Sequence, residues 1–223
     1  MTIETTPYSG IPRFHVGVDC IIFTVIGDRL NLLLVRRDFE PEKGKWSLIG
    51  GFVNENESVD QAAKRVLYEL TGITNGFIRQ LGAFGEINRD PGARVISVAY
   101  FSLLNYAEIN QEEVKSLKGE WVDVDRLPAL GFDHPVMIQN AMEQMRKKIL
   151  SGHLVFNLLP ELFTLTQLQN LVEKVMGRPL DKRNFRKRIM ENTEIVATEY
   201  IDKESSRRGA RLYRFIGERQ SYK

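Results

Sequence analysis

The chain has 223 residues and a mass of 25.7 kDa, which is enough for one large domain or two small ones. Charged residues make up 27% and hydrophobic residues 43%, an ordinary balance for a globular protein that speaks against a mostly disordered chain. The apolar stretches are far shorter than the ~20 residues that span a bilayer, and no signal peptide is evident, so we expect a cytoplasmic protein. The single cysteine, Cys20, excludes an intrachain disulfide, and one cysteine with three histidines makes a structural zinc site unexpected.

The formal net charge of +2 is unevenly distributed along the chain. Residues 150–223 contain 14 Lys and Arg against 9 Asp and Glu, whereas residues 1–149 contain 17 basic and 20 acidic residues. An acidic half followed by a basic half predicts two modules with different partners, and a polyanion is a candidate partner for the second.

The first half has the pattern of a mixed α/β domain. Segments rich in Val, Ile and Phe predict strands, and Gly27-Asp28 predicts a hairpin turn between the first two. The apolar spacing over 58–70 predicts a helix that ends before Gly72. A second helix is expected from an N-cap at Asp133, with Pro135 in its first turn, to about residue 150. The expected strands are 14–25, 30–36, 45–53, 95–104 and 119–124.

The segment 151–160 contains Gly and Pro and is the expected boundary between domains 1–150 and 151–223. After it, Thr164 and Gln167 have the spacing of a capping box, and an apolar stripe continues to Gly177. A second helix over 182–191 and two strands, 195–201 and 210–216, follow. Helix, turn, helix and a hairpin with a basic tip is the order of elements in a winged helix-turn-helix.

The most specific motif of the chain is Gly51-x5-Glu57-x7-Arg65-x3-Glu69-x2-Gly72-Ile73. It resembles the Nudix box, whose pattern is Gly-x5-Glu-x7-Arg-Glu-U-x-Glu-Glu-x-Gly-U with U aliphatic. The resemblance implies an α/β/α sandwich with a mixed sheet, so that the whole chain falls in the α+β class. The segment Arg89-Asp90-Pro91 before an expected strand is similar to the ADP-ribose pyrophosphatase branch of this superfamily.

Two departures from the Nudix pattern bear on catalysis. Active Nudix enzymes have glutamates where this chain has Val66 and Leu70. Diphosphate cleavage by these enzymes needs Mg²⁺, a hard ion held by clustered oxygen ligands. Glu57, Arg65 and Glu69 are then remnants of the box, and we expect no catalytic residues, no bound metal and no cofactor. A blander interpretation makes the same three residues surface ion pairs on a helix that only stabilises the fold.

A basic cluster in the second half predicts a DNA-binding surface. Phe185 and Ile189 share one helical face and are expected to dock the helix, which leaves the long cationic side chains to face a DNA groove. The blander interpretation is a solvated basic face. The candidate DNA-binding residues are Lys182, Arg183, Asn184, Arg186, Lys187 and Arg188 of the helix and Ser205, Ser206, Arg207 and Arg208 of the hairpin tip.

A degenerate Nudix domain followed by a winged helix resembles the Nudix-related transcriptional regulators of bacteria. The resemblance implies a homodimer that binds a palindromic operator and an effector pocket in the Nudix domain. Some members respond to ADP-ribose and control NAD metabolism, but this chain looks most like the arabinose-responsive regulators of Bacteroides. A pentose is also the effector that the missing metal ligands favour, since ADP-ribose carries a diphosphate. The candidate effector-binding residues are Asp19, Arg37, Trp46 and Asp90.

Four functions therefore remain open. The leading interpretation is an effector-controlled repressor of sugar utilisation genes, although the sequence does not distinguish a repressor from an activator. The alternatives are an ADP-ribose-responsive regulator of NAD metabolism and a Nudix hydrolase of ADP-ribose or a related nucleoside diphosphate derivative. A scaffold whose basic domain contacts RNA or an acidic protein is the blandest reading.

Overall fold

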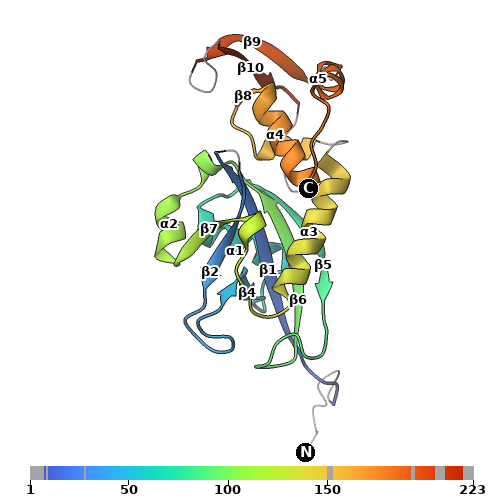
Figure 1. Cartoon of the computed structure of the whole chain (residues 1–223). Coiled ribbons are helices and arrows are strands. Elements are labelled where there is room, and N and C mark those ends of the chain that lie inside the picture. The colour runs from blue at the N-terminus through green and yellow to red at the C-terminus, as the bar shows by residue number, and fades with distance from the viewer. Residues whose placement is uncertain are drawn as a thin grey trace, which may run out of the picture.

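The computed structural model describes residues 8, 10–27, 29–149, 153–191, 194–203 and 209–217. Figure 1 shows two parts, a larger one built on a seven-stranded sheet and a smaller one, in orange and red, built on a three-stranded sheet. The predicted α+β class, a mixed sheet followed by a winged helix, is confirmed.

The large sheet is centred on β1 (His15–Ile26), which forms the predicted hairpin with β2 (Arg29–Arg36). On its other side β1 pairs in parallel with β6 (Val95–Leu103), and this pair makes the sheet mixed. The remaining strands pair antiparallel with β1, β2 or β6. They are β3 (Trp46–Ser47), β4 (Ile49–Phe52), β5 (Phe77–Phe84) and β7 (Gly119–Asp123).

Helices α1 (Val59–Thr71) and α3 (His134–Ile149) cover opposite faces of this sheet. Successive side chains of a strand point to opposite faces, and along β1 the even positions Val18, Cys20 and Ile22 pack with α1. The odd positions Ile21 and Phe23 pack with α3. The short helix α2 (Gln111–Ser116) and three 3-10 turns connect the remaining elements.

Local capping signals fix both ends of α1. The Ser58 hydroxyl oxygen accepts a hydrogen bond from the backbone N–H of Gln61, and the Gln61 side-chain oxygen accepts one from the backbone N–H of Ser58, so the capping box is complete. Gly72 adopts a left-handed conformation (φ 70°) directly after the last turn, as the sequence predicts.

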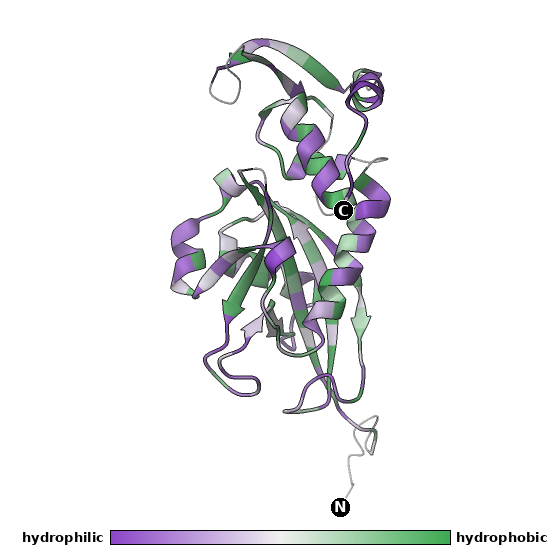
Figure 2. Ribbon diagram, in the orientation of Figure 1, coloured by the Kyte–Doolittle hydropathy of each residue, from purple (hydrophilic) through white to green (hydrophobic). Residues whose placement is uncertain are grey.

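The C-terminal part contains β8 (Leu162–Thr164), α4 (Leu165–Met176), α5 (Lys182–Met190), β9 (Ile195–Asp202) and β10 (Ala210–Phe215). The predicted capping box of Thr164 and Gln167 begins α4, and Asp181 caps α5 through the N–H of Asn184. In Figure 2, α5 is almost wholly hydrophilic, whereas the strands of the large sheet are mostly hydrophobic.

The two parts pack against each other through a shared hydrophobic core. A single cluster of buried residues joins β1, α3 and α4, and it includes Phe23, Met145 and Leu171. At its edge Arg146 Nε of α3 donates to the carbonyl oxygen of Val175 in α4, 2.9 Å away. Lys174 of α4 also forms an ion pair with Asp125 of the large part.

Some elements differ from the predictions. The sequence pattern does not predict β5, α2 or β8. Helix α3 starts at His134, directly after the predicted N-cap residue Asp133. The Asp133 backbone oxygen accepts hydrogen bonds from the N–H groups of Val136 and Met137, but its carboxylate pairs with Arg89. The predicted hairpin tip 205–208 lies outside the described residues. Among the helices that are described, none has the length and apolarity needed to cross a bilayer.

Candidate functional site

A pocket of about 250 Å³ lies at the end of the large sheet where α3 begins. Residues from β1, β4, β6 and the loops around positions 37–41, 89–90 and 132–134 line it. Its walls combine apolar rings with several ionisable groups, the composition expected of a pocket for a polar small molecule.

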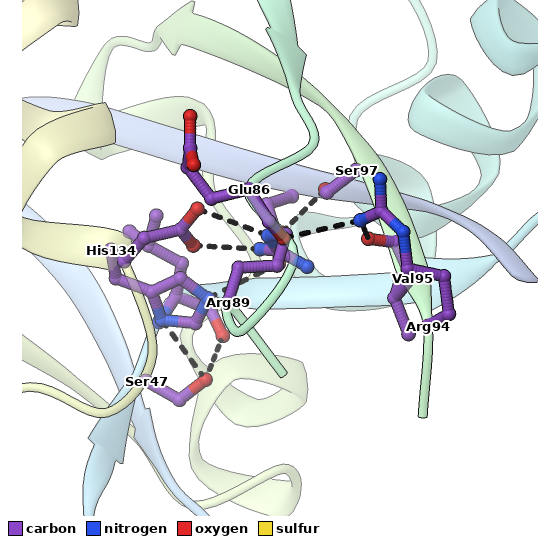
Figure 3. Close-up of polar contacts among 10 residues, drawn as sticks. Ser47, Glu86, Arg89, Arg94, Val95, Ser97 and His134 are labelled. Atoms are coloured by element: carbon purple, nitrogen blue, oxygen red, sulfur yellow. Dashed lines mark hydrogen bonds and ion pairs between the residues drawn. The ribbon is translucent and has the colours of Figure 1, made fainter. Parts of the chain in front are cut away.

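A network of polar and charged side chains lines part of this pocket, and Figure 3 labels Ser47, Arg89, Ser97 and His134 within it. Arg89 makes two hydrogen bonds to Asp133, from Nε at 3.0 Å and from Nη2 at 2.8 Å, and Nη2 also lies 3.3 Å from Asp19 Oδ2. Ser97 Oγ donates to the same Asp19 oxygen at 2.5 Å. The Arg89 side chain is only 4% exposed, so its charge is balanced almost entirely by these two carboxylates.

His134 joins the network to Leu48, the residue between β3 and β4. The backbone N–H of Leu48 donates to His134 Nδ1 at 3.1 Å, which leaves His134 Nε2 to carry a proton toward Asp19 Oδ1 at 3.5 Å. Burial by itself raises the pKa of Asp19, but hydrogen bonds from His134 and Ser97 and the charge of Arg89 outweigh it, and the pKa lies below its ordinary value. Asp19 is therefore a buried carboxylate anion at neutral pH.

Three of the four predicted effector-binding residues come together here: Asp19, Arg37 and Asp90 all line the pocket. Trp46 is not among the described residues that line it. Its strand position sets it opposite Arg36, and its ring packs against the main core with the Arg36 guanidinium above it.

Arg89, Ser97 and His134 are residues of the site that no sequence pattern singles out. Arg89 and His134 stand in segments that the sequence already marks, Arg89-Asp90-Pro91 and the residues at the start of α3, but no local pattern connects these segments to Asp19.

The Nudix helix α1 shows why a metal does not fit. Val66 and Leu70 are 3% and 1% exposed and belong to the core between α1 and the sheet. The Glu57 carboxylate is bound by Arg65 through Nε at 3.0 Å and Nη2 at 2.6 Å, and Arg65 Nη1 lies 3.6 Å from Glu69. In the described part of the chain, no three His, Cys, Asp or Glu side chains gather as metal ligands. The residues present therefore do not fit the Mg²⁺ that Nudix chemistry requires.

A second candidate surface is helix α5. Phe185 is buried and Ile189 half-buried against the core, as predicted, whereas the six polar and basic candidates of this helix are all exposed. Lys182, Arg183, Arg186 and Lys187 are open to solvent. Asn184 and Arg188 instead stand at the edge of a second pocket, of about 370 Å³, between α5 and the end of α3.

Comparison with known proteins identifies two domain families in the chain. The NUDIX domain family matches residues 13–141, and the NrtR DNA-binding winged helix domain family matches residues 155–215. The fold and its two surfaces thus define a Nudix-domain protein with a C-terminal winged helix of the DNA-binding kind. The chain belongs to the NrtR-type family of such proteins, as the following relatives show.

Over 211 residues the chain is 36% identical to the ADPR responsive transcriptional repressor NtrR of Acinetobacter baylyi, and the match covers 93% of this chain and 84% of the relative. NrtR of Shewanella oneidensis, solved in complex with a 27mer DNA, superposes with a TM-score of 0.80 at 32% identity over 90% of this chain and 93% of that one. The NUDIX domain of the same protein, complexed with ADP ribose, gives a TM-score of 0.53 at 29% identity over 63% and 94% of the two chains.

The comparisons do not support the predicted closeness to arabinose-responsive regulators of Bacteroides. The relative that matches nearly the whole chain is named for a response to ADP-ribose.

Proposed function

We propose that this chain is a transcriptional repressor whose Nudix domain senses ADP-ribose and no longer hydrolyses it. The observation that carries the proposal is that the chain lacks metal-binding carboxylates of the Nudix box and has a basic helix in its second domain. The positions that should carry metal-binding carboxylates, Val66 and Leu70, are buried in the core, and the same chain presents an exposed basic helix. A domain that binds a nucleotide without cleaving it, joined to a DNA-binding domain, is the composition of a sensor.

The effector is argued from the pocket and from the relatives together. The pocket offers arginine, carboxylate and aromatic side chains, which suit a ligand with phosphates, sugar hydroxyls and a ring system. A pentose alone would use only part of this set. The closely similar proteins named for ADP-ribose favour the same ligand, so ADP-ribose replaces arabinose as the proposed effector.

For DNA we propose that Lys182, Arg183, Arg186 and Lys187 enter or flank the major groove. All four are exposed, on a helix that is docked through its buried Phe185. A homodimer would place two such helices on a palindromic operator. Ser205, Ser206, Arg207 and Arg208 stay candidates for phosphate or minor-groove contacts.

A mobility-shift titration with DNA from upstream of its own gene tests this proposal. ADP-ribose is expected to release the DNA, whereas arabinose, ribose and AMP at the same concentrations leave it bound. Release by arabinose but not by ADP-ribose would reinstate the sugar interpretation. The same samples with Mg²⁺ are assayed for AMP, and AMP formation at ordinary enzyme turnover would make the chain a hydrolase instead.

A further inference from the structure

The effector pocket has an unfavourable charge for a diphosphate. Its described lining includes three carboxylates, Asp19, Glu40 and Asp90, and two arginines, Arg37 and Arg89. A diphosphate adds two further negative charges, and an uncompensated charge in a partly dry pocket is costly. In Nudix enzymes metal ions supply this compensation, but here the buried Val66 and Leu70 replace two of the carboxylates that would hold them on α1.

Arg89 does not compensate the charge of a diphosphate, because its own charge is already neutralised by Asp19 and Asp133. Its guanidinium is held by Asp133 and Asp19 and is 4% exposed. Moving it toward a ligand would break the bidentate bond to Asp133 and leave two buried carboxylates without their partner. Arg89 therefore shapes the pocket but adds little net positive charge to it.

Arg37, unlike Arg89, is held in place by neutral groups and not by carboxylates. Its guanidinium carbon lies 4.3 Å from the ring centre of Phe39 and 4.9 Å from that of Phe132, so two aromatic rings hold it. Its Nε donates to the carbonyl oxygen of Pro41 at 2.8 Å, which fixes the remaining rotation. Within the described part of the chain Arg37 has no carboxylate partner, and both Nη groups are unused.

We infer that Arg37 is the residue that binds the diphosphate of the effector, and that binding needs no divalent cation. This inference rests on the proposed function, since it assumes a nucleoside diphosphate sugar as the ligand. The planar guanidinium matches phosphate oxygens with two parallel donors, and its orientation is already set by Phe39, Phe132 and Pro41. The rim carboxylates Glu40 and Asp90 then accept hydrogen bonds from sugar hydroxyls.

The experiment is calorimetric titration of the full chain with ADP-ribose, in Mg²⁺ and again in EDTA. Wild type is expected to bind equally in both. Arg37→Gln should bind about 10- to 100-fold more weakly, the loss expected for charge-assisted hydrogen bonds. Arg37→Lys, which keeps the charge but not the paired donors, should recover part of that loss.

Arg36→Gln is the matched control. Arg36 is the exposed neighbour on β2, lies over Trp46 and is not among the described residues that line the pocket, so this variant should bind ADP-ribose like wild type. Binding of operator DNA without effector should be unchanged in Arg37→Gln, which shows that the variant is folded.

The outcomes separate the two proposals. Wild-type affinity in a folded Arg37→Gln variant overturns the assignment of Arg37 while the proposed function stands. Loss of wild-type binding in EDTA overturns the metal-independent recognition. If wild type binds no ADP-ribose in either buffer, the proposed effector and the role of Arg37 are both wrong.

Discussion

At the scale of single residues, the pocket depends on the glycine behind Asp19. A Cβ at Gly50 would lie 2.6 Å from Asp19 Oδ1 and 2.5 Å from the carbonyl oxygen of Val18. Neither neighbour can retreat easily, because Asp19 is held by Ser97 and Val18 belongs to the central strand. Gly50, which directly precedes the first glycine of the Nudix box, thus has a structural role at the pocket.

We predict that Gly50→Ala displaces the Asp19 carboxylate. The unfolding free energy should fall by about 1–3 kcal/mol, the usual cost of overpacking, and ADP-ribose binding should weaken. Denaturant unfolding and calorimetry measure the two effects. Gly85→Ala, whose added Cβ meets only Ile96 at 3.8 Å or more, is the control and should alter both much less. Equal behaviour of the two variants would contradict the close packing at Asp19.

The remnant pair Glu57–Arg65 also makes a residue-scale prediction. Hydrogen bonds from Arg65 lower the pKa of Glu57 to about 2 from an ordinary value of 4.5. Because the folded-state pKa is the lower one, the pair stabilises the fold above pH 4.5 and this stabilisation is lost as the pH falls toward 2. In Arg65→Ala the pKa of Glu57 should rise toward 4.5 in an NMR titration. A pKa that stays near 2 would show that another group holds the carboxylate.

At the scale of elements, α5 is the part of the molecule that we expect to read DNA. Arg186→Ala should weaken operator binding by about 1–3 kcal/mol, because Arg186 is an exposed cation on the proposed DNA-reading helix. Fluorescence anisotropy with a labelled operator measures the change. Lys115→Ala removes an equally exposed cation from α2, far along the chain, and should leave affinity unchanged. Equal losses in both variants would indicate a general charge effect instead of a DNA interface.

Elements with strong local signals were predictable from the sequence, and the others were not. Helices α1 and α4 each begin at a capping box and end at a glycine, so their limits follow from local chemistry. Strand β5 was missed because Arg79, Gln80 and Gly82 interrupt its apolar pattern, and its pairing with β6 shifts register at that point.

The candidate site could be predicted only in part for a related reason. A buried Asp19 needs partners, which the sequence alone implies, but their identity depends on contacts across the fold. Arg89 and Asp19 are 70 residues apart, and Arg89 and Asp133 are 44 apart. The parallel pairing of β1 with β6 places Ser97 beside Asp19, and no local pattern encodes that register.

At the scale of the whole molecule, α3 connects the pocket to the DNA-binding domain. Its first residue, His134, contacts Asp19, and near its other end Arg146 donates to Val175 in the last turn of α4. A ligand that shifts the start of α3 can therefore move α4 and the packed α5. Coupling of this kind amounts typically to about 1–3 kcal/mol.

We predict that Arg146→Ala uncouples the two domains. The variant should bind ADP-ribose and operator DNA separately with near-wild-type affinity, because Arg146 is not among the described residues of either surface. ADP-ribose should then weaken its DNA binding much less than it does in wild type. Full release by ADP-ribose in this variant would place the coupling elsewhere.

The most direct test is the operator affinity of the intact protein measured with and without saturating ADP-ribose, in EDTA. We predict at least about tenfold weaker DNA binding in the presence of ADP-ribose, which corresponds to a coupling of about 1.4 kcal/mol. An operator affinity that ADP-ribose leaves unchanged would contradict this prediction.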